Sequence, residues 1–208
     1  MKYLKIRLYL LVFIFFNVIP YSMGKSAADG FISIKNEKQM LFQDKVKQNK
    51  DSFLKKVKEI SEKLNINPDW LMFLMYNESG LDSTVVNKMG GATGLIQFMP
   101  ATAKGLGTTK EQLRAMSNVE QLDYVYKYFA LYKNRITSAY DLYSICFMPI
   151  ILGKPDSWVL KTKNLSAETI ARYNPAFDLN KDKQITVAEW KKYLDVKFAK
   201  YGVNPFEL

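Results

Sequence analysis

One glutamate at the end of an apolar run is the residue best suited to acid–base chemistry in this chain. The run "DWLMFLMYNES" has apolar residues on every face, which predicts a buried helix that begins at Asn67-Pro68 and ends at Gly80. Glu78 would lie in the last turn, where desolvation and the negative end of the helix dipole favour the protonated carboxyl. Such a carboxyl suits a general acid; the alternative is a glutamate that reaches the surface as its helix ends.

The residues after this acid form a glycine-rich loop suited to a polar ligand. Gly90, Gly91 and Gly94 permit positive φ and a close approach of the backbone to a ligand. Gln97 adds an amide that can donate to and accept from sugar hydroxyls and N-acetyl groups. Pro100 then begins a short predicted helix, "PATAKGLG".

The two blocks "ES" and "GATGLIQFMPATA" together resemble the soluble lytic transglycosylase (SLT) family of the lysozyme-like superfamily. The resemblance implies a mainly α, lysozyme-like helical domain of the goose-type lysozyme and SLT kind, and a lytic transglycosylase acting on peptidoglycan. In that family one carboxyl protonates the glycosidic oxygen of the MurNAc-GlcNAc β-1,4 bond. It then acts as base on the C6 hydroxyl of the muramic acid, which gives a 1,6-anhydro-MurNAc product. The resemblance assigns this acid/base role to Glu78, and substrate binding or support of the acid to Ser79, Gly94 and Gln97.

Two further components of the site are left open. Asp82 could act as a second carboxylate after Glu78, although its residue type favours capping a turn. A third family block resembling A-Y-N-A-G is absent, and "SAYDLYSICFMPIILGKPDSW" stands in its region. Tyr143 is the candidate substrate-binding phenol from this region. Tyr140 and Phe147 are alternatives, and each of the three could instead be a core aromatic.

Two other functions fit the same residues. A muramidase would use the same fold and acid with water as the nucleophile. A catalytically silent glycan-binding or scaffold protein of the envelope would keep the fold; the retained Glu78 argues against it, and the missing third block argues for it. The absence of histidine removes the usual residues of zinc and serine-triad sites, and the single Cys146 cannot form an intramolecular disulfide.

The first residues predict export. A basic start precedes an apolar run at residues 8–20 that is too short to span a bilayer, which predicts a signal peptide cleaved after Gly24 or Ala28. An uncleaved anchor is the alternative. We expect a periplasmic or extracellular, cell-wall-associated protein that has no stable membrane span after cleavage.

The positive net charge of the chain suits binding to an anionic cell wall. The formal net charge is +10, and the lysines are dispersed rather than gathered into one run. We therefore expect peptidoglycan glycan strands as the partner, no nucleic acid, and a monomer.

The chain divides into four predicted segments: a signal peptide at 1–24, an N-terminal segment at 25–47, the SLT lysozyme-like catalytic domain at 48–175, and an EF-hand-like extension at 176–208. Amphipathic or apolar patterns predict further helices within residues 40–66, 117–136 and 139–152.

The C-terminal sequence "DLNKDKQITVAE" resembles an EF-hand calcium loop. Oxygen-bearing residues occupy the alternating ligand positions: Asp178, Asn180, Asp182, Gln184, Thr186 and Glu189. We expect a structural Ca²⁺ here, with Gln184 using its backbone carbonyl and Glu189 a bidentate carboxylate, and no cofactor for catalysis. Lys183 stands where the sharp turn favours glycine. The alternative is an Asx-rich turn that caps the following helix.

Overall fold

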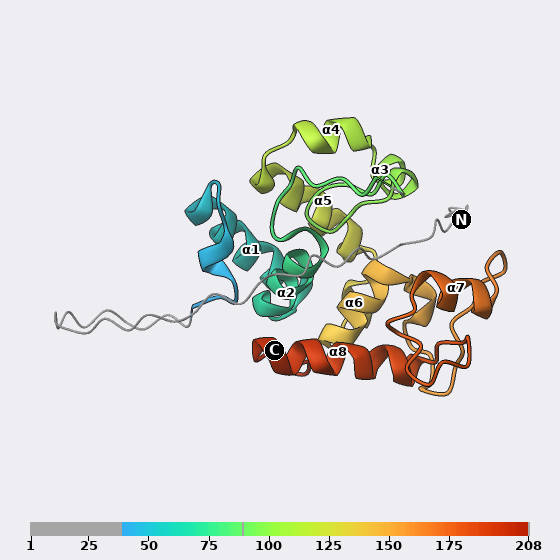
Figure 1. The fold of residues 1–208 in the computed structure, drawn as a ribbon. Coiled ribbons are helices and arrows are strands. Elements are labelled where there is room, and N and C mark those ends of the chain that lie inside the picture. The colour runs from blue at the N-terminus through green and yellow to red at the C-terminus, as the bar shows by residue number, and fades with distance from the viewer. Residues whose placement is uncertain (1–38, 89, 208) are drawn as a thin grey trace, which may run out of the picture.

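The computed structural model describes residues 39–88 and 90–207; the predicted signal peptide lies outside the described residues. Within them the chain folds into α-helices and short 3-10 turns, with isolated β-bridges and no sheet, as Figure 1 shows. The helices are α1 (Lys50–Leu64), α2 (Pro68–Ser79), α3 (Pro100–Gly105), α4 (Lys110–Ala115), α5 (Asn118–Ala130), α6 (Ala139–Phe147), α7 (Ala167–Tyr173) and α8 (Val187–Tyr201). The predicted mainly α fold class is confirmed for the described residues. Among the described residues, no helix has the length and apolar character needed to cross a membrane.

Helix α2 is the buried centre of the fold, as its sequence predicts. The Asn67 side chain caps its start by accepting a hydrogen bond from the Asp69 N–H at 2.8 Å. Gly80 ends the helix in the left-handed conformation, at φ 64°. The stretch from Trp70 to Met75 is buried on every face of the helix. Helices α1 and α6 pack against α2 and bring the rest of the chain around it.

Helix α8 belongs to the same core as α2, although the two are far apart in the sequence. The rings of Phe73 in α2 and Phe198 in α8 have centroids 4.9 Å apart. Just beyond α8, the Asn204 carbonyl accepts a hydrogen bond from the Trp70 indole N–H at 2.8 Å. These contacts fix α8 beside α2 and α6 (Figure 1).

The helix predicted within residues 139–152 is shorter than expected. It ends at Phe147, and Met148 adopts an extended conformation with φ −157° and ψ 94°. The cause is Pro149, which has no N–H to donate and disfavours a helical conformation in the residue before it.

The other two predicted helices are also shorter than their patterns. The pattern at 117–136 forms α5 up to Ala130 and then a separate 3-10 turn at Lys133–Arg135, where polar and basic residues interrupt the apolar stripe. The pattern at 40–66 forms one α-helix, α1, preceded by a 3-10 turn.

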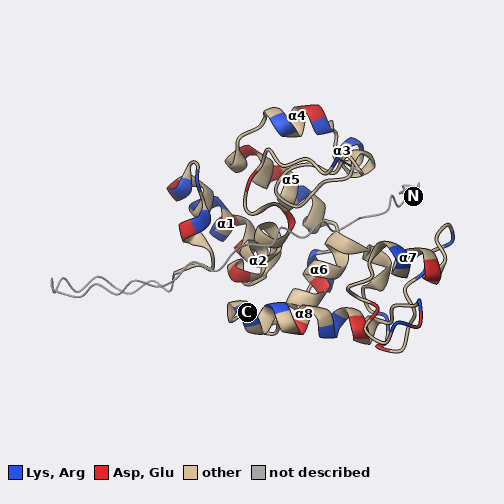
Figure 2. Ribbon diagram, viewed as in Figure 1, with Lys and Arg blue, Asp and Glu red and all other residues tan. Residues whose placement is uncertain are grey.

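Charged residues of both signs are interspersed on the outer helices, including α1, α4 and α8 (Figure 2). One ion pair, Lys56 with Asp123 at 2.7 Å, links α1 to α5. The Asp123 side chain is largely exposed, so such a pair contributes little to stability.

The glycine-rich loop is anchored to α5 by Gln121, a fully buried amide that the sequence analysis did not single out. Its Oε1 accepts from the Leu95 N–H at 3.0 Å, and its Nε2 donates to the carbonyls of Ser83 and Leu113 at 2.8 and 2.7 Å. Gly94, at φ 78°, passes so close that a Cβ atom there would overlap this amide. The fold itself therefore requires glycine at this position.

We predict that Gly94→Ala destabilises the protein more than Gly107→Ala does. Both glycines have nearly the same positive φ, 78° and 79°, but a Cβ on Gly107 has nothing within 4 Å. Backbone strain alone should cost about 1–2 kcal/mol in Gly107→Ala. Displacing the buried Gln121 amide should add about 1–3 kcal/mol in Gly94→Ala. Urea unfolding of the two variants measures the difference, and equal losses would contradict the anchoring role of Gln121.

Candidate active site

Glu78 lies in the last turn of α2, and its carboxyl is enclosed by neighbouring elements. The residue as a whole is only partly buried, but Oε1 exposes less than 1 Å² and has no hydrogen-bond partner among the described residues. Burial raises the pKa of the Glu78 carboxyl to about 8, while a hydrogen bond from Tyr143 and the charge of Lys197 act in the opposite direction. The carboxyl is therefore protonated at neutral pH.

The groups that surround this carboxyl come from α6 and α8. Burial and the nearby Glu78 charge raise the pKa of the Tyr143 hydroxyl and the Cys146 thiol of α6, and of the Tyr193 hydroxyl of α8. These three groups stay neutral near pH 7 as a result. Burial lowers the pKa of the Lys197 ammonium, and the charge of Glu78 raises it. Lys197 is thus the cation that faces the acid, and the sequence analysis did not single it out.

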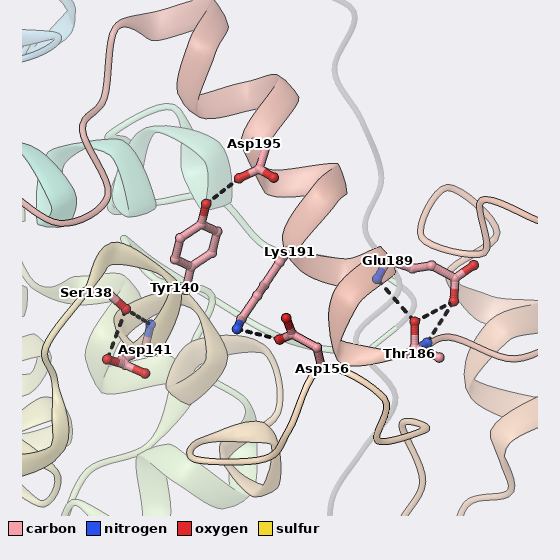
Figure 3. Close-up of polar contacts among 8 residues, drawn as sticks. All are labelled: Ser138, Tyr140, Asp141, Asp156, Thr186, Glu189, Lys191 and Asp195. Carbon is pink, nitrogen blue, oxygen red and sulfur yellow. Dashed lines mark hydrogen bonds and ion pairs between the residues drawn. The ribbon is translucent and has the colours of Figure 1, made fainter.

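Of the three aromatic candidates for the missing third block, Tyr143 is the one whose hydroxyl acts on the Glu78 carboxyl and lowers its pKa. Tyr140 instead donates a hydrogen bond to the Asp195 carboxylate of α8 (Figure 3). Phe147 packs edge-on against Phe177, with ring centroids 5.3 Å apart. The predicted role of Tyr143 in substrate binding remains a prediction, but its place beside the acid is a feature of the structure.

The other predicted site residues tie the glycine-rich loop to the end of α2. The Ser79 hydroxyl lies 2.9 Å from the Leu95 carbonyl of the loop. Gln97 is buried at φ 52°, and its Nε2 donates to the carbonyls of Gly94 and Val85 at 3.1 and 3.3 Å. Both donors of this amide therefore serve the loop fold, and direct sugar binding by Ser79, Gly94 and Gln97 remains a prediction.

Asp82 occupies a turn, as its residue type predicts. Its exposed side chain accepts hydrogen bonds through Oδ1 from the Thr84 N–H at 2.8 Å and the Thr84 hydroxyl at 2.7 Å. These bonds give the carboxylate a local structural role as the cap of this turn.

The predicted calcium loop adopts a tight turn at Lys183, whose φ is 66°. The Lys183 N–H donates to the Asp178 carboxylate at 3.0 Å, and the Gln184 N–H donates to the Asp182 carboxylate at 2.8 Å. Lys183 thus adopts the left-handed conformation for which glycine is favoured. The carboxylate oxygens of the loop accept hydrogen bonds from the backbone of the same loop.

Glu189, the predicted bidentate ligand, caps helix α8. Its carboxylate accepts from the Thr186 N–H at 2.9 Å and the Thr186 hydroxyl at 2.8 Å (Figure 3). In residues 39–88 and 90–207, no group of three or more acidic, histidine or cysteine side chains is arranged to hold a metal. The types of oxygen donor in the loop fit Ca²⁺, but Glu189 would have to leave this cap to reach the ion.

A separate surface hollow of about 360 Å³ lies between the start of α6 and α8, and Glu78 is not among its lining residues. Two of its polar pairs are drawn in Figure 3: Lys191 with Asp156 at 2.7 Å, and Tyr140 with Asp195. The hollow is therefore separate from the Glu78 carboxyl.

The helical fold, the buried acid and the loop held against it define a lysozyme-like domain. Comparison with protein families bears this out: residues 55–140 match the family described as Transglycosylase SLT domain. The predicted resemblance is therefore confirmed over this segment, which contains Glu78 and the glycine-rich loop. The match indicates transglycosylase activity on peptidoglycan, and hence a site of action outside the cytoplasm. No curated protein and no solved structure matches the chain.

We predict that the pH dependence of stability changes in Glu78→Gln. Between pH 4.5, the ordinary carboxyl pKa, and about 8, the folded protein holds a proton that the unfolded chain has released. The free energy of unfolding contributed by this group therefore falls as pH rises through the window, and levels off above it. The amide does not titrate, so Glu78→Gln should gain stability relative to wild type as pH rises.

Urea unfolding across this pH window measures the effect. Glu62→Gln, an exposed change on α1, is the matched control and should follow the wild-type pH dependence. Parallel curves for wild type and Glu78→Gln would contradict a buried, protonated acid.

Proposed function

We propose that the chain is an exported peptidoglycan lytic transglycosylase that cleaves the MurNAc-GlcNAc β-1,4 bond and forms 1,6-anhydro-MurNAc. The observation that carries the proposal is the enclosed Glu78 carboxyl, with a pKa of about 8, inside the segment that matches an SLT domain. An acid whose pKa lies near the working pH is suited to give up its proton and take one back.

The proposed reaction uses this one carboxyl twice. Glu78 first donates its proton to the glycosidic oxygen, and the electrons of the broken C1–O bond remain with the departing sugar. The resulting carboxylate then removes the proton of the C6 hydroxyl, whose oxygen bonds to C1 and closes the anhydro ring. No water is consumed, and Glu78 regains its proton.

The environment of Glu78 supports both stages of this sequence. Burial favours the protonated acid that the first stage requires. The Tyr143 hydroxyl, which lowers the pKa of this carboxyl, stabilises the carboxylate that exists between the two stages. Tyr143 would contact the glycan strand through its phenol. Ser79 at the end of α2, and Gly94 and Gln97 in the loop, would hold the strand against the acid through the shape of the loop.

The muramidase alternative differs in the nucleophile alone, since water would replace the C6 hydroxyl. A glycan-binding protein without catalysis would not need the raised pKa of Glu78. The glycan strand is the proposed partner in all three cases, and we propose that the protein acts as a monomer.

Digestion of purified peptidoglycan, with mass analysis of the fragments, tests the proposal. We predict products lighter by one water than hydrolytic muropeptides, and a rate lowered about 10²–10⁴-fold in Glu78→Gln, which cannot deliver a proton. Fragments with free reducing ends would identify a muramidase. Binding without cleavage would identify a silent glycan-binding protein. Cleavage by Glu78→Gln near the wild-type rate would remove Glu78 from the mechanism.

We also propose that the loop Asp178–Glu189 binds Ca²⁺ weakly, with Asp178, Asn180, Asp182, Gln184 and Glu189 as ligands. The alternating oxygen donors and the left-handed turn at Lys183 support this proposal. The ion would have a structural role, holding the loop to the start of α8. Weak binding is expected because Glu189 must exchange its bonds to Thr186 for the ion.

Thermal melting with Ca²⁺ or with chelator tests the calcium proposal. We predict a higher Tm with Ca²⁺, because an ion that binds only the folded state adds about 2.7 kcal/mol when its concentration is 100 times Kd. Glu189→Gln keeps an oxygen for the α8 cap but loses the charged bidentate ligand, so its response should be much smaller. Lys183→Gly should respond more strongly. Equal responses in wild type and Glu189→Gln would mean that the loop is a turn and a cap.

A further inference from the structure

We propose that Lys197 of α8 is a positioning residue for Glu78: it holds the last turn of α2 and stabilises the carboxylate left after the acid has given up its proton. This inference rests on the proposed function of Glu78 and assigns part of that function to a helix beyond the SLT match, which ends at residue 140. The structure supports it through hydrogen bonding, packing and charge.

The first support is a direct contact with the residue that precedes the acid. The Lys197 ammonium donates to Asn77 Oδ1 at 2.9 Å, and Asn77 Nδ2 donates to the Phe73 carbonyl one turn earlier at 2.8 Å. Lys197 is thereby bonded into the turn that carries Glu78. Phe198, the next residue on α8, packs against Phe73 of α2 and so holds this part of α8 beside α2.

The second support is that the C-terminal end of α2 has no positive charge of its own. The last turn of this described helix contains no basic residue of its own, and its negative end disfavours a carboxylate at Glu78. Lys197 supplies a cation there from another helix. Its ammonium also lies over the Tyr193 ring of the same helix, 5.3 Å from the ring centroid.

The third support is that the other groups facing the acid are uncharged. Tyr143 and Cys146 approach Glu78 from α6, and Tyr193 from α8; burial keeps all three neutral near pH 7. Lys200, the other basic residue that acts on Lys197, opposes its protonation. Lys197 is therefore the cation available to balance the negative charge on Glu78 during the reaction.

The test compares variants that separate charge from hydrogen bonding. Lys197→Gln keeps a donor for Asn77 without charge, Lys197→Met removes both, and Lys197→Arg keeps the charge. Lys192→Met, an exposed change on the same helix, is the matched control. Circular dichroism checks folding, and if Lys197→Met does not fold, Lys197→Gln carries the comparison.

The primary measurement is NMR titration of the Glu78 carboxyl with ¹³C-labelled glutamate, assigned by the signal lost in Glu78→Gln. Removing a neighbouring positive charge should raise the titration midpoint by about one pH unit in Lys197→Met and Lys197→Gln. Lys197→Arg and Lys192→Met should titrate close to wild type. A wild-type midpoint in the two uncharged variants would overturn the proposal.

The second measurement is the pH profile of fragment release. We predict that kcat falls about tenfold in Lys197→Met, the equivalent of one pH unit, while KM changes little and the alkaline limb moves to higher pH. A change in KM alone, with an unmoved profile, would contradict the role. The titration needs no turnover, so it tests Lys197 even if the wild-type protein cleaves no glycan and the proposed function fails.

Discussion

The enclosure of one carboxyl at the end of α2 is the constraint on which the rest of the site depends. Charge is costly in a water-poor environment, so the Glu78 carboxyl keeps its proton up to a pKa of about 8. The helix that carries it is buried on every face from Trp70 to Met75, and groups of α6 and α8 surround its last turn. These elements together exclude water from Glu78 Oε1.

The loop and the helices achieve this enclosure by different physical means. The loop is held by polar groups: the buried Gln121 amide both accepts from and donates to backbone there, and the Gln97 amide donates to loop carbonyls. The helices are held by aromatic packing, as between Phe73 and Phe198. A polar anchor fixes the loop in one conformation because its hydrogen bonds are directional, while aromatic contacts supply the burial.

The parts of the site that could be predicted are those encoded locally. The start and end of α2, the place of Glu78 and the loop glycines each follow from a few adjacent residues. The stop of α6 was also encoded, by Pro149, and was missed. Lys197 could not be found in this way: among the many lysines of α8 it has the spacing of a solvated face, and its contact with Asn77 depends on how distant helices pack. Gln121 was hidden for the same reason, since an amide within an amphipathic helix gives no local sign of a buried partner.

The border of the SLT match has a consequence for comparing chains of this kind. The segment 55–140 contains the acid and its loop, but Tyr143, Cys146, Tyr193 and Lys197 all lie beyond it. On the proposed mechanism, the recognisable blocks supply the reacting group, while residues after them contribute to its pKa, which burial raises most. Two chains with the same blocks can thus work in different pH ranges. Adaptation to an acidic or alkaline habitat is therefore expected to change residues of α6 and α8 rather than the motif.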